Sequence, residues 1–339
     1  MKLIRTEDAV GHVLCHDLTQ IIKDQYKDAR FRKGHVVTEE DIPVLLSMGK
    51  EHLYVWEMTP GMLHENDGAE RLCALCANEY MDRSEVKEGK IELKAACDGL
   101  FRVNSEKLIA VNSIEDLMIA TRKGGTAVRK GDKLAGMRVI PLIIPEEKLR
   151  AAEDAVGTAP LLELKPWVRK TAAIVATGSE VKKGLIQDTF TPVVRDKLAA
   201  YGIETISVAY SGDGVEHVAN AVTEARKTGA DVILCTGGMS VDPDDNTPGG
   251  IKESGAQIVT YGAPVLPGAM FLLGYYDDGT PVMGLPGCVM YAGATIFDLV
   301  LPYVAADVPV TRAQIVALGE GGLCLGCKPC HWPACPFGK

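Results

Sequence analysis

The chain has 339 residues, a formal net charge of −9 and an apolar fraction of 47%. This length allows roughly two to three domains, and this composition excludes disordered, collagen-like and coiled-coil proteins. The acidic balance, without a long basic run, argues against general nucleic-acid binding. No apolar stretch approaches the roughly 20 residues of a transmembrane helix, and the first residues lack the apolar core of a secretory signal. We therefore expect a cytoplasmic protein that binds neither nucleic acid nor membrane.

Residues 1–165 are predicted to form an accessory α+β region rich in strands. Helices are expected at Thr38–Met48, with Thr38 as the cap, and at Met62–Met81. Short apolar runs predict strands at His52–Trp56, Leu100–Val103, Ile109–Val111 and Arg138–Ile144. The segment Glu146–Lys165 is interpreted as a helix and a linker, which places a domain boundary near Pro166.

Beyond Pro166, strands and helices alternate. A fully buried strand is predicted at Ala172–Ala176, and further strands are predicted at Glu204–Ala209, Asp231–Cys235 and Met283–Leu285. The helices between them are expected at Phe190–Tyr201, from a capping box at Asp213-x-x-Glu216 to Gly229, and from Pro286-Gly287 to about Leu301. This alternation is typical of an α/β, doubly wound and mainly parallel sheet, which we expect over residues 166–310.

In such a sheet, ligands bind beyond the carboxyl ends of the strands. Four glycine-bearing or acidic segments follow these ends, namely Thr177–Glu180, Ser211–Asp213, Thr236–Asp245 and Gly284–Gly287. Gly237-Gly238 lets backbone approach a ligand closely, and free N–H groups favour phosphate. Asp242, Asp244 and Asp245 would repel a phosphate unless a cation such as Mg²⁺ lies between them. Any one of these loops fits a plain turn, but the set predicts one crevice for phosphate and cation.

The same half of the chain carries an ordered series of motifs. They are Thr177-Gly-Ser-Glu-Val181, Gly184, Asp188-Thr189, Gly212-Asp213, Thr236-Gly-Gly-x-Ser240 with Asp245 and Thr247, Pro267-Gly268, and Gly284-Leu-Pro-Gly287. This order resembles the molybdopterin-binding domain of the molybdenum-cofactor biosynthesis family, over about Thr171–Val304. Molybdopterin molybdenumtransferases, gephyrin and molybdopterin adenylyltransferases share that domain. The resemblance implies a pterin ligand, molybdopterin or its adenylylated form, bound together with Mg²⁺.

The resemblance also implies roles for individual residues. The acidic residues of the site would be Glu180, Asp188, Asp213 and Asp245. The pterin and its phosphate would be held by Thr177, Gly178, Thr236, Gly237, Gly238, Ser240, Pro267, Gly268, Gly284, Leu285, Pro286 and Gly287. A homodimer is expected on the same ground, with a molybdoenzyme or another cofactor-biosynthesis protein as a partner.

Several positions depart from the transferase pattern. Ser179 stands where the family has Asp, Phe190 where it has Asn, and Cys288-Val289 where it has Asn-Pro. The family's Lys-Pro-Gly-Lys-Pro is Leu266-Pro-Gly-Ala-Met270 here, which removes two cations suited to gripping molybdate or a nucleotide phosphate. Binding is therefore favoured over catalysis. Two alternatives stay open: an active molybdenumtransferase or nucleotidyltransferase, and a regulatory or scaffold protein that kept the fold.

Four of the ten cysteines lie in a short tail, residues 311–339. Their pattern is Cys324-x-x-Cys327-x-x-Cys330-x4-Cys335, followed by Pro336. Two C-x-x-C steps suit a tetrahedral zinc site or an iron–sulfur cluster, although the last spacing is one residue longer than in bacterial ferredoxins. The tail is predicted to bind zinc or an iron–sulfur cluster, and Cys97, Cys73 or Cys76 could also complete the site. The alternative is a disordered tail of reactive thiols, or of disulfides formed on exposure to air. A separate pair, Cys73-x-x-Cys76, shares one face of a predicted helix, but it is a weaker candidate for metal or redox chemistry because no βαβ pattern lies next to it.

Overall fold

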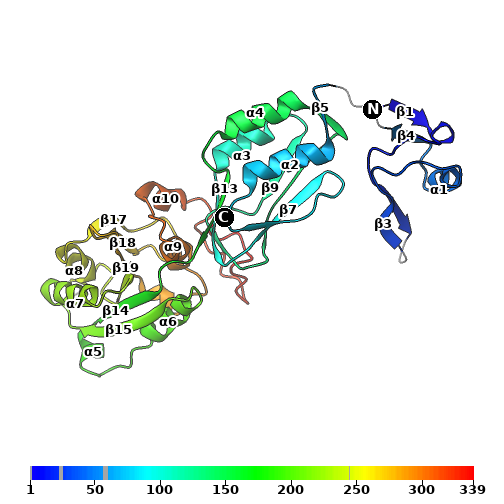
Figure 1. Cartoon of the computed structure of the whole chain (residues 1–339). Helices are drawn as coiled ribbons and strands as arrows, with labels where there is room; N and C mark the ends of the chain where they lie inside the picture. Colours follow the sequence, from blue (N-terminus) through cyan, green and yellow to red (C-terminus); the bar gives the residue numbers. More distant parts are fainter. Residues whose placement is uncertain (1, 23–25, 56–59, 244) are drawn as a thin grey trace. The chain divides into compact units, whose positions relative to one another are not determined.

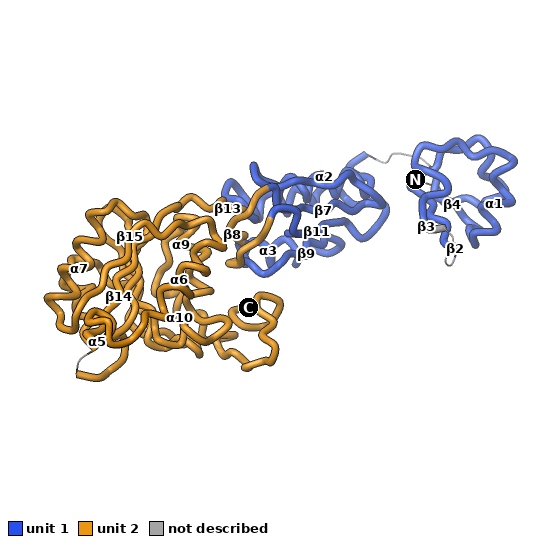
Figure 2. The backbone as a smooth tube through the Cα atoms, turned by 90° about the horizontal axis from the view of Figure 1, so that it is seen from below, with its two compact units in different colours: residues 1–96, 103–124, 130–163 blue, residues 97–102, 125–129, 164–339 orange. Residues whose placement is uncertain are grey.

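The computed structural model describes residues 2–22, 26–55, 60–243 and 245–339. The chain divides into two compact units that interleave along the sequence, drawn in blue and orange in Figure 2. The first unit comprises residues 1–96, 103–124 and 130–163, and the second comprises residues 97–102, 125–129 and 164–339. No helix in the described part of the chain is both long and apolar enough to cross a membrane.

The first unit begins with small antiparallel strand pairs around a short helix. The elements are β1 (Lys2–Arg5) paired with β4 (His52–Val55), the short helix η1 (Thr6–Asp8), the pair β2 (Leu18–Ile22) and β3 (Tyr26–Phe31), and α1 (Asp41–Ser47). Ala9, Leu14, Leu45 and Leu53 form the centre of their common apolar core. The end of the predicted strand at Trp56 lies outside the described residues.

The predicted helix over Thr38–Met48 begins three residues later than expected. The carboxylate of Asp41 accepts hydrogen bonds from the backbone N–H and the hydroxyl of Thr38, both at 2.9 Å. These bonds close a turn before the helix, so Thr38 does not cap it. The residue in the cap position is Glu40, which makes no side-chain cap.

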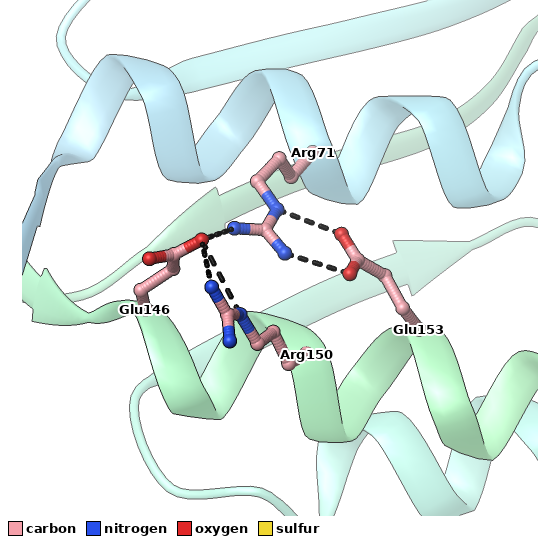
Figure 3. A network of polar contacts seen from close by, with 4 residues as sticks. All are labelled: Arg71, Glu146, Arg150 and Glu153. Atoms are coloured by element: carbon pink, nitrogen blue, oxygen red, sulfur yellow. Dashed lines mark hydrogen bonds and ion pairs between the residues drawn. The ribbon is translucent and has the colours of Figure 1, made fainter. Parts of the chain in front are cut away.

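The rest of the first unit is an antiparallel sheet covered by helices (Figure 1). Its strands, in the order β6-β7-β11-β9, are Met81–Arg83, Lys90–Ala95, Lys133–Val139 and Leu117–Thr121. Its helices are α2 (Glu65–Cys76), α3 (Ser105–Asn112) and α4 (Glu146–Val156), and a further strand pair joins β5 (Met62–His64) to β12 (Ile143–Pro145). Helices α2 and α4 are tied by ion pairs: Arg71 makes a bidentate contact with Glu153 and a third contact with Glu146, which also pairs with Arg150 (Figure 3).

Several predictions for this region are wrong in type or extent. Ile109–Val111 is not a strand but the end of α3, whose first turn is capped by the side chain of Asn104 on the N–H of Lys107. An apolar run this short fits a helix as well as a strand, so periodicity alone misassigns it. The predicted helix Met62–Met81 is shortened to Glu65–Cys76, and Arg138–Ile144 belongs to two strands.

A three-stranded sheet, in the order β10-β8-β13, uses chain from three distant places. Its strands are β8 (Gly99–Val103), β10 (Thr126–Val128) and β13 (Leu162–Pro166). Strand β13 occupies part of what was predicted as a linker. The two strands β8 and β10 lie mainly in the second unit, where β10 packs against helix α9 (Ile296–Ala305).

The second unit is built on a six-stranded sheet in the order β15-β14-β16-β19-β18-β17. The first four strands run parallel: Glu204–Ser211, Thr171–Thr177, Val232–Thr236 and Pro281–Leu285. Strands β18 (Leu272–Tyr275) and β17 (Gln257–Tyr261) complete it as an antiparallel edge. The predicted α/β fold with a mainly parallel sheet is confirmed.

Helices cover both faces of this sheet. They are α5 (Ser179–Lys182), α6 (Phe190–Ala199), α7 (Val215–Lys227), α8 (Thr247–Glu253), α9 and α10 (Arg312–Ala317), with a short 3-10 helix η2 (Gly287–Met290). Alternate residues of β14 face opposite cores: Ala172 and Ile174 pack with α6 and α9, whereas Ala173 and Val175 pack with α7 and α8. Burial on both faces explains why this strand is apolar throughout.

Two details of the second unit differ from prediction. Asp213 does not cap α7, because Gly214 occupies the cap position and no side chain bonds there. The last helix does not run on from Gly287: that residue begins η2, and α9 starts at Ile296 behind a capping box of Thr295 and Asp298. The strands β17 and β18 and the helix α8 were not predicted.

Candidate functional site

The four predicted loops lie along one edge of the second unit's sheet. In the register of the parallel strands, Thr177 pairs with Ser211, Ala176 with Thr236, and Thr236 with Leu285. The strands therefore end level with one another, and the loops that follow them leave from the same edge. Residues 267–268 lie shortly before β18, whose first residue, Leu272, pairs with Gly284 at this edge.

The loops after β14 and β15 are joined by direct hydrogen bonds. The Oδ2 atom of Asp213 accepts from the backbone N–H of Ser179 at 3.2 Å, and the Ser179 hydroxyl lies 3.5 Å from the N–H of Asp213. Asp213, predicted as an acidic site residue, thus holds the two loops together. Glu180 follows on α5 and is exposed to solvent.

The loops after β14 and β16 are in still closer contact. The buried hydroxyl of Thr177 lies 3.0 Å from the carbonyl oxygen of Thr236 and 2.9 Å from the hydroxyl of Thr247. A Cβ atom on Gly237 would lie only 2.2 Å from the carbonyl oxygen of Thr177, and one on Gly238 only 2.7 Å from the Thr247 hydroxyl. Both glycines have positive φ, at 84° and 55°. These glycines are therefore required by contacts within the chain, whether or not a ligand binds.

Gly284 and Gly268 are also packed against the chain. A Cβ atom would come within 2.5 Å of the Met239 sulfur at Gly284, and within 2.6 Å of Ile296 at Gly268. Gly287 is different, since a Cβ atom there would have no neighbour within 4 Å in the described structure. Of the glycines predicted to hold the ligand, Gly287 therefore presents open backbone at the edge of the sheet.

Asp188 has a local structural role. Its Oδ1 atom accepts hydrogen bonds from the backbone N–H groups of Phe190 and Thr191, at 3.0 and 2.9 Å, which are the first residues of α6. Burial acts to raise the pKa of Asp188, but the hydrogen bonds from Thr191 and Phe190 outweigh it and hold the pKa below its ordinary value. The carboxylate is thus an anionic cap at the start of a helix.

The carboxylates of Glu180 and Asp245 are available for a ligand. Neither carboxylate makes a hydrogen bond or an ion pair with the residues the structure describes, and Asp245 is half-buried. Burial raises the pKa of Tyr261, and the negative charge of Asp245 adds to that rise. Asp244 lies outside the described residues. Within residues 2–22, 26–55, 60–243 and 245–339, no three histidine, cysteine, aspartate or glutamate side chains are grouped closely enough to hold a metal ion.

The four tail cysteines are free thiols. Cys324 and Cys335 are half-buried, and Cys327 and Cys330 are exposed. By the same search of the described residues, the predicted ligand set is not assembled around one point.

The pair Cys73 and Cys76 is buried in the first unit. Burial raises the pKa of Cys73, and it raises the pKa of Cys76 to about 12. Both thiols are therefore held protonated and unreactive near neutral pH.

One functional candidate was missed from the sequence. The Nζ atom of Lys182 lies 3.9 Å from the position that a Cβ atom on Gly212 would take, so this cation sits over the loop after β15. Lys182 makes no ion pair with any described residue. The signal in the sequence is Lys182-Lys183 directly after the motif Thr177–Val181, away from the positions near residue 268 where the family has its lysines.

Comparison with known proteins identifies the domain that carries this edge. Residues 173–306 match the family model described as "Probable molybdopterin binding domain", and residues 3–57 match a model described as a domain of unknown function. Residues 173–306 therefore form a molybdopterin-binding-type domain of the molybdenum-cofactor biosynthesis family. The rest of the chain lies outside that model.

Curated relatives share only a short stretch with this chain. A CinA-like protein of Desulfosudis oleivorans is 42% identical over 83 residues, which cover 24% of this chain and 20% of the relative. A CinA-like protein of Pseudothermotoga lettingae is 35% identical over 85 residues, covering 25% and 21%. A "Probable FAD synthase" of Caenorhabditis briggsae is 32% identical over 84 residues, covering 25% and 16%. The matches thus span about a fifth of the length of these relatives.

Two solved structures align with this chain at low overall similarity. The molybdopterin biosynthesis enzyme MoaB of Thermus thermophilus aligns with a TM-score of 0.33 and 19% identity, over 42% of this chain and 99% of its own. A putative molybdenum-cofactor biosynthesis protein of Corynebacterium diphtheriae aligns with a TM-score of 0.34 and 17% identity, over 42% and 100%.

Proposed function

We propose that this protein binds molybdopterin, or its adenylylated form, at the carboxyl edge of the second unit's sheet. The observation that carries the proposal is the set of four loops ending level at one edge, within a domain of the molybdopterin-binding type. Ligands of parallel α/β sheets bind at such an edge. The open backbone at Gly287 and the buried packing of Gly237 and Gly238 give that edge a fixed shape.

The phosphate of the ligand is expected to lie between Gly287 and Lys182. Backbone N–H groups that point outward from a loop bind phosphate well, and a lysine supplies a point charge of opposite sign. Lys182 would thereby replace, from another loop, the cations lost at Leu266 and Ala269. We infer that the cation that contacts the phosphate comes from the segment after β14, and not from residues 266–269.

The residues present also suit a magnesium ion bound together with the phosphate. Mg²⁺ is usually held by one or two carboxylates plus phosphate oxygens and water, not by a complete protein cage. Glu180 and Asp245 carry carboxylates with no partner in the described chain, so they can fill that role. The ion would neutralise the repulsion between these acids and the phosphate.

Binding is favoured over catalysis because the two family lysines near residue 268 are absent. An active molybdenumtransferase or nucleotidyltransferase is the alternative, and turnover of molybdopterin in the presence of molybdate or nucleotide would reveal it. A homodimer and a cytoplasmic location remain predictions, as does a molybdoenzyme or cofactor-biosynthesis protein as a partner.

Anaerobic calorimetry with molybdopterin tests the proposal directly. We expect saturable binding that weakens when EDTA removes Mg²⁺, and that weakens at least tenfold in Asp245→Ala, because a carboxylate on the ion is lost. Gly287→Val should lose affinity similarly without losing stability, since its side chain projects into open space. Glu253→Ala, at the exposed end of α8, is the control. Absence of binding by the unaltered protein, with or without Mg²⁺, would disprove the proposal.

A further inference from the structure

The C-terminal tail is a closed loop fastened to the second unit at both ends. At its start, the backbone N–H of Leu266 donates to the carbonyl of Gly322, and the N–H of Cys324 donates to the carbonyl of Leu266, both at 2.8 Å. At its end, the N–H of Gly338 donates to the carbonyl of Gly321 at 2.9 Å. Residues 322–337 therefore leave and return at almost the same point.

The packing of this loop lies mainly at its two ends. The Phe337 side chain is 2% exposed in the core of the second unit, and the ring of Trp332 meets it edge-on at 5.7 Å. The half-buried Cys324 and Cys335 lie against the same core. Every residue from 325 to 331 is exposed, and the loop contains neither helix nor strand. Apolar burial thus holds the two ends of the loop in place. It does not hold the exposed segment between them, residues 325–331, which we call the arch.

The four cysteines are placed so that a shared ligand would connect the arch to the two ends of the loop. Cys324 and Cys335 lie near the fastened ends, while Cys327 and Cys330 lie on the exposed arch. The Cys330 sulfur lies 2.7 Å from the position of a Cβ atom on Gly293, which brings the arch back against the domain. Because residues 325–331 carry little packing, the arch can move its two thiols toward the other two.

We propose that Cys324, Cys327, Cys330 and Cys335 bind one thiophilic metal centre, which closes the tail into a folded unit. Four thiolates in a tetrahedral arrangement suit Zn²⁺ or an iron–sulfur cluster. In the zinc case, four S–H bonds are replaced by four S–Zn bonds and the thiol protons pass to solvent. The centre uses none of the side chains assigned to the pterin site, so metal binding and pterin binding are tested separately and either proposal can fail without the other.

Fastening the tail also fixes one border of the carboxyl edge. Leu323 pairs with Leu266 in a parallel bridge, directly before Pro267 and Gly268. Metal loss should therefore loosen residues 264–268 as well as the tail. Hydrogen exchange of the Leu266 and Cys324 amides, which donate the two bonds at the start of the loop, reports that change.

The test uses the full chain, without a polyhistidine tag, purified under argon. Zinc, iron and acid-labile sulfide are measured before and after incubation with one equivalent of Zn²⁺ and removal of the excess. We expect either zinc at about one per chain or iron with sulfide and a visible absorption band, which identifies the centre. The double variant Cys327→Ser/Cys330→Ser should retain roughly a tenth or less of that metal. Cys97→Ser, outside the tail, should retain all of it.

A second measurement does not depend on the variants. Maleimide labelling of Cys327 and Cys330, followed by peptide mass spectrometry, should be slowed roughly tenfold or more by the metal and restored by a chelator. The exposed positions of these two thiols make the double variant neutral for folding, and far-ultraviolet circular dichroism checks this. Three results would overturn the proposal: no metal retained by the unaltered chain, equal metal in the double variant, or labelling that the metal does not slow.

Discussion

Glycines that look alike in the sequence have two different roles at the carboxyl edge. Gly237 has no room for a side chain because the carbonyl oxygen of Thr177 lies against it, whereas Gly287 faces open space. The first kind keeps two loops in contact, and the second kind leaves backbone free for a ligand. A motif match does not distinguish the two roles. The residue that packs against Gly237 is Thr177, which lies sixty residues away in the chain.

Replacement of Gly237 by alanine is therefore expected to destabilise the protein itself. The new Cβ atom would lie 2.2 Å from the Thr177 carbonyl oxygen, so strand ends must separate, at a loss of about 2 kcal/mol or more in the free energy of unfolding. Gly279→Ala is the matched control, because Gly279 has nearly the same φ, 81° against 84°, with no neighbour within 4 Å. In Gly279→Ala the free energy of unfolding should fall by only about 1 kcal/mol, which is the cost of backbone strain at positive φ. Urea unfolding compares the two, and equal losses would refute the packing role.

Lys182 and Lys183 offer a second matched pair. Both are exposed and adjacent, but Lys182 is the one whose ammonium lies over Gly212. We expect Lys182→Gln to weaken molybdopterin binding roughly tenfold and to reduce its salt dependence, because a charge-assisted contact with phosphate is lost. Lys183→Gln should change affinity less than about twofold, as a remote exposed charge does. Calorimetry at two salt concentrations measures both, and equal effects would remove Lys182 from the site.

At the scale of single elements, helix α6 depends on Asp188 at its start. Asp188→Ala should lower the free energy of unfolding by about 1 kcal/mol, because two N–H groups lose their acceptor. Asp196→Ala, exposed on the same helix, is the control and should be nearly neutral. Thermal unfolding measures both variants. If Asp188→Ala leaves the stability unchanged, the carboxylate does not cap α6 and is available to contact a ligand.

The charge on Asp188 also predicts a pH dependence. The pKa of Asp188 is lower in the folded protein than its ordinary value of 3.8, so the folded state is stabilised above that value. This contribution should be lost as the pH falls below 3.8 and through the folded pKa. Asp188→Asn keeps an acceptor oxygen but has no charge, so its stability deficit should shrink over the same range. A deficit that is constant from pH 6 to pH 3 would contradict the assignment.

Strands with uniform burial are among the elements that the sequence predicts correctly. Strand β14 is buried on both faces and is therefore an apolar run, and the parallel strands β16 and β19 are likewise buried along their whole length. Helix α8 was missed because Pro248 and two glycines in its short sequence resemble a loop. Strands β17 and β18 were missed because the expectation of strict strand–helix alternation left no place for an antiparallel hairpin.

The candidate site was predictable in position but not in detail. Topology alone places the loops after parallel strands at one edge, so the convergence of Thr177, Ser211, Thr236 and Leu285 followed from the strand pattern. The partners of individual side chains did not. Asp213 bonds to Ser179 and Thr177 to Thr247, and these contacts depend on how loops distant in the sequence meet.

At the scale of the whole molecule, the second unit includes two short segments from the first half of the sequence, residues 97–102 and 125–129. Strand β10 packs against α9, and Gly125 lies against the ring of Tyr303. A fragment of residues 166–339 would lack β8 and β10, and we expect it to melt several degrees or more below the full chain. Scanning calorimetry on both proteins measures the difference. An equal melting temperature would show that residues 166–310 fold independently, as the sequence suggested.

The interleaving of the two units also sets an order for synthesis on the ribosome. Residues 97–102 and 125–129 emerge well before β14–β19, the sheet of the unit to which they belong. During that interval β8 and β10 have only each other, and an isolated two-stranded hairpin is marginally stable. The second unit can therefore complete only after its last helices have been translated. The carboxyl edge can therefore acquire its final shape only after α9 has left the ribosome, and a nascent chain stalled before α9 would carry its binding loops without a finished domain to hold them.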